Sequence, residues 1–335
     1  MSSALLLRLS SLGDIAKSLP LVSLLADRGW RIGWLVEQRF AELLSLATSP
    51  VECLVWKRGL IGIWNLRGKG KDFDCVLDIQ GNGKSGLLAA VLGCPVVYAP
   101  NREDLRERWN LWLKARRAPP APSPHVLDRS LAVLSRVLGE ELCRDDLGPP
   151  PHLEAPEEAR VRLAADLERI GIPPDEPLLA IVSRRPDDPR AWPLQRAVEL
   201  SRAWQGPSLL LLGPGERPVC PPPGVLVLRQ QKGELGLLVA LGRHLREGDG
   251  RAVGHDGGAM HVLHAAGARC LFLFGPQDPG RTGPLGGQTR QSGTLQAPIH
   301  LACRPCLSRS CRLPEGPRCM AEITADRALE ELLML

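Results

Sequence analysis

The sequence lacks any apolar run long enough to cross a membrane. A spanning helix needs roughly 18 consecutive apolar residues, and no segment approaches that length. The N-terminal segment MSSALLLRLSSLGDIAKSLPLVSLLA has the leucines of a signal peptide, but Arg8 and Asp14 interrupt its apolar core. We therefore expect neither a leader nor an anchor, and a cytoplasmic protein.

The sequence also lacks a large excess of charge of one sign. There are 42 Lys and Arg residues against 37 Asp and Glu residues, which gives a net charge of +5 with the signs interspersed. A nucleic-acid-binding domain concentrates positive charge, so we expect no nucleic-acid partner, while an anionic substrate is compatible. The apolar content of 44% and charged content of 24% are typical of a packed globular protein. A length of 335 residues is enough for two domains.

Cysteines are grouped at only one place. Four thiols fall within seventeen residues near the C-terminus, at Cys303, Cys306, Cys311 and Cys319. Four thiolates can close a tetrahedral structural zinc site, although the spacing is not that of a standard zinc finger. The alternative is a loop with reduced thiols. Neither interpretation gives a metal a catalytic role, and we expect no cofactor.

Short apolar strands alternate with helical segments along most of the chain. In the first half we expect strands at residues 4–9, 31–36, 51–56, 74–79 and 95–98, and helices at 15–26, 40–45, 84–92 and 126–138. The second half repeats the pattern, with strands at 178–182, 208–212, 225–228 and 269–274, and helices at 157–170, 235–245 and 259–266. Such alternation forms parallel βαβ units. The predicted fold class is α/β, with two doubly wound Rossmann-like domains at residues 1–160 and 161–335 facing across a cleft, and with the Cys-rich segment and a C-terminal helix in the second.

A glycine-rich stretch at residues 254–284 has the features of a phosphate site. It opens on the acidic turn HDGG, continues as a short helix and a buried strand, and closes on a second glycine loop that holds Arg281 and Thr282. The first helical amides after Gly257 and Gly258 have no intrahelical partners and lie at the positive end of the helix dipole. The alternative is a plain helix cap followed by an ordinary strand–loop turn.

A basic segment at residues 101–117 carries two tryptophans. Read as a helix, it places Trp109 and Trp112 on an apolar stripe, with Arg102 and Arg106 on a neighbouring face. Two arginines four residues apart can present two planar forks to an anionic ligand. The alternative is a solvated helix face whose tryptophans pack inward.

Several motifs occur in order along the chain. They are LLLRLSSLGDIAKSLP, DIQGNGKSGLL, NREDLRERW, HVLDRSLAVL, GPGE, GHDGGAMHVLHAAGARCLFLFGPQDPGRTGP and the tail CRPC…C…RCMAEIT. Together these stretches resemble glycosyltransferase family 9, the ADP-heptose:lipopolysaccharide heptosyltransferases. The resemblance implies a GT-B fold, with the acceptor on the N-terminal domain and the nucleotide-sugar donor on the C-terminal domain. It also implies inverting transfer of a heptose or related sugar without a metal ion.

The resemblance assigns the catalytic base to Asp14, the last residue of the (S/T)-x-G-D loop. A carboxylate on a loop at the carboxyl end of a strand can accept the proton of an acceptor hydroxyl. The alternative is that Asp14 is an ordinary helix N-cap before Ile15.

On the donor side, the resemblance assigns Asp256 and His261 to the family pattern D-(S/T)-G-x-x-H. Arg190 stands at the lysine of K-x-W-P, where it would neutralise the departing diphosphate, and Glu216 follows the glycine pair, where it would bind ribose. The full predicted donor set is Ser183, Arg190, Glu216, Asp256, Gly257, Gly258, His261, Arg281 and Thr282.

The predicted acceptor set comes from the N-terminal motifs and the basic segment. It comprises Ser11, Gly13, Gln80, Gly81, Lys84, Arg102 and Arg106. The expected partners are a nucleotide-diphosphate sugar and an anionic glycan or glycolipid, reached by peripheral contact with the inner face of the cytoplasmic membrane.

Three departures from the family pattern concern the donor. The usual Pro-Gly-Ala loop is replaced by residues 183–185, Gly257 replaces a hydroxyl residue, and Arg190 replaces a lysine, which is not a neutral change at a bidentate site. They leave a second hypothesis open, a non-catalytic nucleotide- or glycan-binding relative. A third, a nucleotide-sugar epimerase, is disfavoured by the acceptor-side base.

Overall fold

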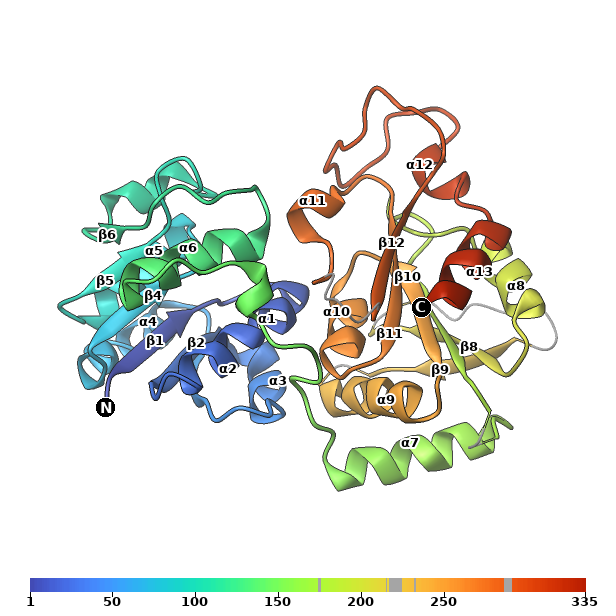
Figure 1. Cartoon of the computed structure of the whole chain (residues 1–335), viewed down its shortest axis with the longest axis horizontal. Coiled ribbons are helices and arrows are strands. Elements are labelled where there is room, and N and C mark those ends of the chain that lie inside the picture. Colours follow the sequence, from blue (N-terminus) through green and yellow to red (C-terminus); the bar gives the residue numbers. More distant parts are fainter. Residues whose placement is uncertain (174–175, 215, 217–224, 232, 286–290) are drawn as a thin grey trace. The chain divides into compact units, whose positions relative to one another are not determined.

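The structure, a computed structural model, describes the chain apart from residues 174–175, 215, 217–224, 232 and 286–290. The chain divides into two compact units, Met1–His152 and Leu153–Leu335 (Figure 1). The predicted boundary at residue 160 lies inside a helix of the second unit, Glu157–Arg169. Among the described residues, no helix combines the length and the apolar character needed to cross a membrane.

The first unit is built on a parallel six-stranded sheet in the order β3-β2-β1-β4-β5-β6. Its strands are β1 Ser3–Leu7, β2 Arg31–Glu37, β3 Glu52–Trp56, β4 Cys75–Asp78, β5 Val97–Ala99 and β6 Arg116–Arg117. The central strand β1 is buried along its whole length, which its unbroken apolar sequence predicts for a strand covered on both faces. It pairs in parallel with β2 and β4.

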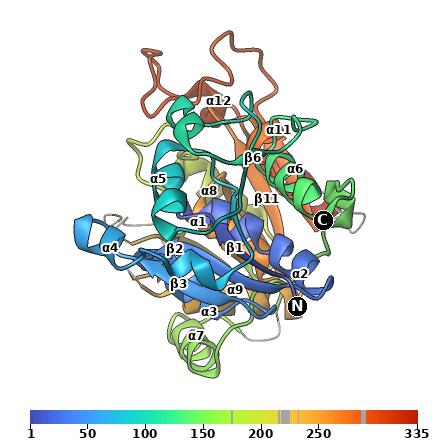
Figure 2. The ribbon, with the colours of Figure 1, turned by 90° about the vertical axis from the view of Figure 1, so that its left-hand side faces the viewer.

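Helices cover both faces of this sheet. Their bounds are α1 Leu12–Ser18, α2 Pro20–Ala26, α3 Ala41–Ser45, α4 Leu60–Trp64, α5 Gly83–Leu92 and α6 Val126–Leu138. Four short 3₁₀ segments accompany them: η1 Gln38–Phe40, η2 Lys69–Asp72, η3 Arg108–Trp112 and η4 Arg144–Asp146. Figure 2 shows α4 and α5 on one side of the sheet and α2 and α6 on the other.

The predicted helix over residues 15–26 is two helices, and its start is earlier than expected. α1 begins at Leu12 with Ser11 as its N-cap, so Asp14 lies inside the first helical turn. The N-cap interpretation of Asp14 is therefore wrong, as is its placement on a loop. Pro20 starts α2 because it has no N–H to donate back into α1 but suits the first position of a helix.

The helical interpretation of residues 101–117 is also wrong. Only η3 and the short strand β6 are regular within it. Asn101 turns the chain by local bonds, since its side chain accepts from the Glu103 N–H and its carbonyl from the Asp104 N–H. Trp109 is 69% exposed and Trp112 is 83% exposed, so these tryptophans do not pack inward.

The second unit repeats the plan with a parallel sheet in the order β12-β11-β10-β7-β8-β9. The strands are β7 Leu179–Val182, β8 Ser208–Leu212, β9 Leu226–Arg229, β10 Arg251–His255, β11 Arg269–Phe274 and β12 Ser292–Gln296. The helices are α7 Glu157–Arg169, α8 Leu194–Ala203, α9 Leu235–Glu247, α10 Gly258–Ala265, α11 Pro279–Thr282, α12 Arg318–Ala321 and α13 Ala325–Met334. The prediction of two doubly wound parallel sheets is confirmed.

Candidate active site

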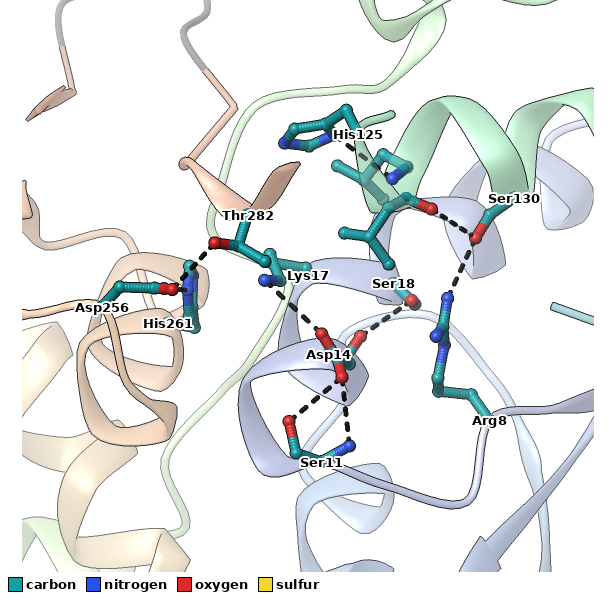
Figure 3. Close-up of polar contacts among 12 residues, drawn as sticks. Arg8, Ser11, Asp14, Lys17, Ser18, His125, Ser130, Asp256, His261 and Thr282 are labelled. Atoms are coloured by element: carbon teal, nitrogen blue, oxygen red, sulfur yellow. Dashed lines mark hydrogen bonds and ion pairs between the residues drawn. The ribbon is translucent and has the colours of Figure 1, made fainter. Parts of the chain in front are cut away.

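Asp14 is fixed in the first turn of α1, directly after strand β1. Its Oδ2 accepts hydrogen bonds from the Ser11 N–H at 3.3 Å and from the Ser11 hydroxyl at 3.1 Å. Its Oδ1 lies 3.5 Å from Lys17 Nζ, one turn along the helix. Figure 3 shows these contacts around the carboxylate. The capping arrangement orients the carboxylate without any further element.

The surroundings of Asp14 keep it ionised. Burial raises the pKa of this carboxyl group, but the charges of Lys17 and Arg8 lower it more. The Ser11 N–H and the charge of Arg106 add to the lowering, so the pKa falls to about 2. Asp14 is therefore an anion, and ready to accept a proton, throughout the neutral range.

Arg8 is a site residue whose position in the sequence indicates only a break in an apolar run. Arg8 is 3% exposed, and its Nη2 donates to the Ser130 hydroxyl at 3.1 Å. Burial lowers the pKa of Arg8, while Asp14 and Asp78 raise it. The charge of this buried arginine offsets the charges of the two carboxylates, and an arginine within an apolar run is the signal that could have revealed it.

Gln80, predicted to bind the acceptor, holds the loop between β1 and α1. Its Oε1 accepts from the Leu9 N–H at 2.6 Å, and the side chain is buried. Beside it, Asp78 Oδ1 accepts from the N–H groups of Gln80 and Gly81, at 3.0 Å each. Gln80 thus positions the segment that leads to Asp14, and Gly81 adopts a φ of +67°, which suits glycine.

The other predicted acceptor residues differ in their contacts and in their exposure to solvent. Lys84 lies 3.7 Å from the buried Glu37 and 5.5 Å from the centre of the Trp56 ring. Arg102 and Arg106 are exposed and lie outside any helix, so the two-fork arrangement on one helix face is not formed. Ser11 is exposed, whereas Gly13 is buried within α1.

In the second unit, Asp256, His261 and Thr282 form one hydrogen-bonded group. Asp256 lies after β10, and its Oδ1 is 2.7 Å from His261 Nε2 on α10. The Thr282 hydroxyl, on α11, donates to Asp256 Oδ2 at 2.8 Å. Figure 3 shows the carboxylate between the two side chains. The structure thus brings together the two ends of the glycine-rich stretch, as the sequence predicted.

The geometry around Gly257 accounts for one departure from the family pattern. A Cβ at this position would lie 2.5 Å from His255 Nε2. The His255 ring is buried and accepts from Arg184 Nη1 at 3.2 Å, because burial, with the charges of Arg184 and Arg190, lowers the pKa of His255 to about 3. Glycine at position 257 therefore makes room for the histidine at position 255.

The loop after β7 holds an ion-pair cluster that centres on Asp188. Arg190 Nε and Nη2 donate to the two Asp188 oxygens at 2.9 Å each, and Arg184 Nε is 2.5 Å from Oδ2. Burial raises the pKa of Asp188, but these bonds lower it more. Ser183 extends the pairing of β7, since its N–H donates to the Leu211 carbonyl. Sequence reasoning found Arg190 and missed Arg184 and Asp188.

Two further donor candidates differ in their surroundings. Burial raises the pKa of Glu216, although the charges of Arg184 and Arg185 lower it. Arg281 lies on α11, one residue before Thr282 and beyond the Asp278 N-cap. Within the described part of the chain, Arg281 makes no ion pair, in contrast to Arg184 and Arg190, which both bind Asp188.

The described residues include all four thiols of the cysteine cluster, and the zinc interpretation stays a prediction. No three His, Cys, Asp or Glu side chains among them converge to hold a metal ion. Cys303, Cys306 and Cys311 are exposed, whereas Cys319 is buried in the core of the second unit. A Cβ on Gly275 would lie 3.2 Å from Cys319 Sγ. Cys319 therefore serves packing, and the other three thiols lie on the surface.

Comparisons with known proteins find similar chains. The family model of glycosyltransferase family 9 (heptosyltransferase) matches residues 247–315, which include β10, α10, β11 and α11. The lipopolysaccharide heptosyltransferase 1 of Pseudomonas aeruginosa is 26% identical, across 98% of this chain and 96% of the relative. The chain is therefore similar to glycosyltransferase family 9 and to its heptosyltransferases. These similarities support a glycosyltransferase enzyme.

Solved structures show the fold. A family 9 glycosyltransferase from Veillonella parvula has a TM-score of 0.74 at 16% identity, covering 100% of this chain and 98% of that one. The E. coli ADP-heptose lipopolysaccharide heptosyltransferase II has a TM-score of 0.68 at 20% identity, covering 100% and 98%. The E. coli heptosyltransferase WaaC with ADP has a TM-score of 0.65 at 20% identity, covering 99% of each chain. The fold is of the GT-B type with two Rossmann-like domains.

Proposed function

We propose that this family 9 enzyme transfers a heptose from ADP-heptose to an anionic glycan of the lipopolysaccharide type. The similarity to lipopolysaccharide heptosyltransferase 1 supports the choice of sugar and acceptor. The observation that carries the proposal is the Asp14 carboxylate, which its neighbours hold ionised at the carboxyl end of β1. A glycosyl transfer to a hydroxyl group needs a base of this kind on the acceptor side.

The proposed reaction is a single inverting displacement. The acceptor hydroxyl oxygen forms a bond to the anomeric carbon while the bond from that carbon to the diphosphate oxygen breaks. The hydroxyl proton passes to Asp14, and ADP leaves with the electron pair of the broken bond. Because the sugar is attacked from the side opposite the diphosphate, its anomeric configuration inverts.

We propose that protein groups of the second unit, rather than a metal ion, hold the donor diphosphate. The backbone amides at the start of α10 and the guanidinium of Arg281 suit a diphosphate. Asp256 is fixed by His261 and Thr282, so it can accept hydrogen bonds from donor hydroxyls in one orientation. Turnover in EDTA at the rate measured with added Mg²⁺ is the expected result, and restoration of a lost rate by Mg²⁺ would refute this assignment.

The test of the function is a transfer assay with ADP-heptose and a heptose-deficient lipopolysaccharide core. Mass spectrometry is expected to show addition of one heptose, and NMR the inverted anomeric configuration. Asp14→Asn should lower kcat by roughly a hundredfold or more, with an unchanged donor Kd. The matched control is Asp27→Asn, an exposed carboxylate of the same unit. Equal kcat values in the two variants would remove Asp14 from the mechanism.

One observation favours a second candidate, a binding protein that does not catalyse transfer. Arg190 stands where the family has a lysine, and here it forms a bidentate pair with Asp188 instead of a free charge. Calorimetric binding of ADP-heptose with no product after long incubation with several core acceptors would support this candidate over the enzyme.

A further inference from the structure

The short helix α4 presents an apolar face to solvent. Leu60 is 85% exposed, Ile61 79% and Trp64 69%. These three side chains form what we call the α4 patch. The opposite side of the helix is already occupied, because Ile63 packs on the core of the first unit and Leu66, just beyond the helix, is buried. A surface helix normally places polar residues on its outer face, so burial within this unit does not explain the α4 patch.

The sequence around the α4 patch is strongly basic. The stretch KRGLIGIWNLRGKGK, residues 57–71, has five basic residues and no acidic one, whereas the whole chain has a net charge of only +5. The basic residues are all exposed, and they are Lys57, Arg58, Arg67, Lys69 and Lys71. Arg58 pairs with Glu37 at 2.9 Å. The other four make no ion pair with any described residue, so their charge is available to an anionic surface.

The α4 patch places a tryptophan beside basic side chains, and both residue types favour the headgroup level of a bilayer. The Arg67 guanidinium lies 5.4 Å from the centre of the Trp64 ring. Tryptophan favours the headgroup level of a bilayer, where its ring is apolar and its N–H is wet. Lysine and arginine beside it are attracted to anionic lipids. Protein interfaces, by contrast, are depleted in lysine, and two copies of this patch would bring like charges together.

A second element with exposed aromatic side chains packs on the same helix as α4. Both α4 and the 3₁₀ segment η3 contact α5, and Figure 2 shows α4 and α5 on the same side of the sheet. η3 exposes Trp109 and Trp112, whose ring centres are 5.5 Å apart, and α5 exposes Leu87, which is 53% accessible. Exposed apolar side chains on this scale with a charged rim mark an interaction site.

We propose that the α4 patch and its basic rim dock the protein on the surface of an anionic phospholipid bilayer. Leu60, Ile61 and Trp64 enter the headgroup region, and the lysines and arginines pair with lipid phosphates. The inference deepens the proposed function and rests on it in one respect, that a glycan acceptor anchored in a membrane must be reached from that membrane.

Flotation of the full chain with vesicles tests the docking. Binding is expected to vesicles of phosphatidylcholine with about a third phosphatidylglycerol, and not to pure phosphatidylcholine. The triple variant Leu60→Ser/Ile61→Ser/Trp64→Ser should bind at least about tenfold more weakly. The matched control, Val161→Ser/Leu333→Ser/Met334→Ser, removes three exposed apolar side chains from the second unit and should bind like the wild type. Equal binding by the two triple variants would overturn the proposal.

The charged rim is tested separately with Lys57→Gln/Lys69→Gln/Lys71→Gln. Three lost charges near an anionic surface should weaken binding on the order of a hundredfold, and the wild-type affinity should fall steeply with salt. Unchanged affinity in this variant would contradict the charge argument. Sedimentation velocity tests the alternative that a second copy of the chain covers the α4 patch. A dimer that forms in the wild type and is lost in the α4-patch variant would support that alternative and contradict the docking proposal.

Two acceptors keep this inference distinguishable from the proposed function. With a delipidated, water-soluble core acceptor, the α4-patch variant should match the wild-type kcat/KM. With the intact glycolipid in vesicles, it should lose about the same factor as in flotation. No transfer to either acceptor by the wild type would refute the proposed function, whereas vesicle binding would still decide the docking surface.

Discussion

At the scale of single residues, the charge state of Asp14 is set by three cations. Lys17, Arg8 and Arg106 all favour the carboxylate, against the effect of burial. A base with a pKa of about 2 is weak but is ionised at every physiological pH. The acid limb of the rate profile should therefore lie well below neutrality, and the neighbours of Asp14 should determine where.

Replacing Lys17 tests this electrostatic control. Lys17→Met removes the nearest positive charge, 3.5 Å from Asp14 Oδ1. Because a lowered pKa means that the carboxylate is lost only as the pH falls through it, the substitution should move the acid limb of kcat/KM upward. The expected shift is on the order of one pH unit from a limb near the Asp14 pKa of about 2, so kcat/KM is measured with a soluble acceptor from neutral pH down to about pH 2, with circular dichroism as the check that the protein stays folded.

The control for Lys17 is Lys114→Met, which removes an exposed cation of the same unit. Its profile should overlay that of the wild type. A Lys17→Met profile with the wild-type acid limb would show that Asp14 is not the titrating base, even if the rate itself were lower.

The pair His255 and Gly257 gives a second prediction at this scale. Gly257→Ser restores the family hydroxyl but places a Cβ 2.5 Å from His255 Nε2. Crowding of a packed site costs about 1–3 kcal/mol, so this variant should unfold at a lower denaturant concentration. His255→Ala/Gly257→Ser should recover part of the loss, since the ring that causes the crowding is gone. Additive losses in this double-mutant cycle would refute the coupling.

At the scale of elements, a buried polar network attaches η3 to α5. Asp78 Oδ2 accepts from Asn110 Nδ2 at 2.6 Å and from the Ser85 hydroxyl at 2.9 Å. Asn110 Oδ1 also accepts from Arg117 at 2.8 Å. Because Asp78 is fully buried and burial raises its pKa, these donors are needed to keep its oxygens satisfied.

Asn110→Ala should therefore destabilise the protein by about 1–3 kcal/mol, since it removes one donor from the buried Asp78 Oδ2 and one acceptor from Arg117 Nη1. Urea unfolding followed by circular dichroism measures the change. Asn65→Ala, at an exposed position of the same unit, should change stability by less than about 0.5 kcal/mol. A loss in Asn110→Ala no larger than in Asn65→Ala would mean that the network is not structural.

The elements that sequence predicted well are those with a strong local signal. Unbroken apolar runs such as residues 208–212 gave β8 with its bounds correct, because a buried parallel strand needs nothing else. Residues 101–117 have the spacing of an amphipathic helix but do not form one, since spacing alone cannot show that Asn101 bends the chain. The Arg184–Asp188–Arg190 cluster was missed for a related reason, because charge pairing across a loop depends on backbone geometry that the sequence does not display.

Site residues were predictable as positions but not as partners. The glycine-rich stretch predicts Asp256, His261 and Thr282 as members of one donor site, and the hydrogen bonds that join them are visible only in the structure. The role of Gln80 in holding the Leu9 N–H depends on two strands adjacent in the sheet but far apart in the sequence. Pairings of that kind follow from the tertiary fold, and a single sequence carries no record of them.

At the scale of the whole molecule, the two units carry different tasks under the proposed function, and ligand-induced stabilisation can separate them. A ligand that binds only the folded state raises stability by RT ln(1 + [L]/Kd), about 2.7 kcal/mol at a hundredfold excess over Kd. We expect ADP to raise Tm by several degrees in a thermal-shift assay, and UDP to raise it less.

The variants Arg281→Gln and Asp14→Asn should differ in the rise in Tm that ADP produces. Arg281 lies beside Thr282 on α11 and makes no ion pair with the described residues, so its loss should remove attraction to the diphosphate without breaking a native contact. The ADP-induced shift should fall to less than half in Arg281→Gln and stay at the wild-type value in Asp14→Asn, because Asp14 belongs to the first unit. Arg309→Gln, in the exposed Cys-rich segment of the second unit, is the charge-matched control. An undiminished ADP shift in Arg281→Gln would place the diphosphate elsewhere in the second unit and leave the α10 amides as the part of the site still to be tested.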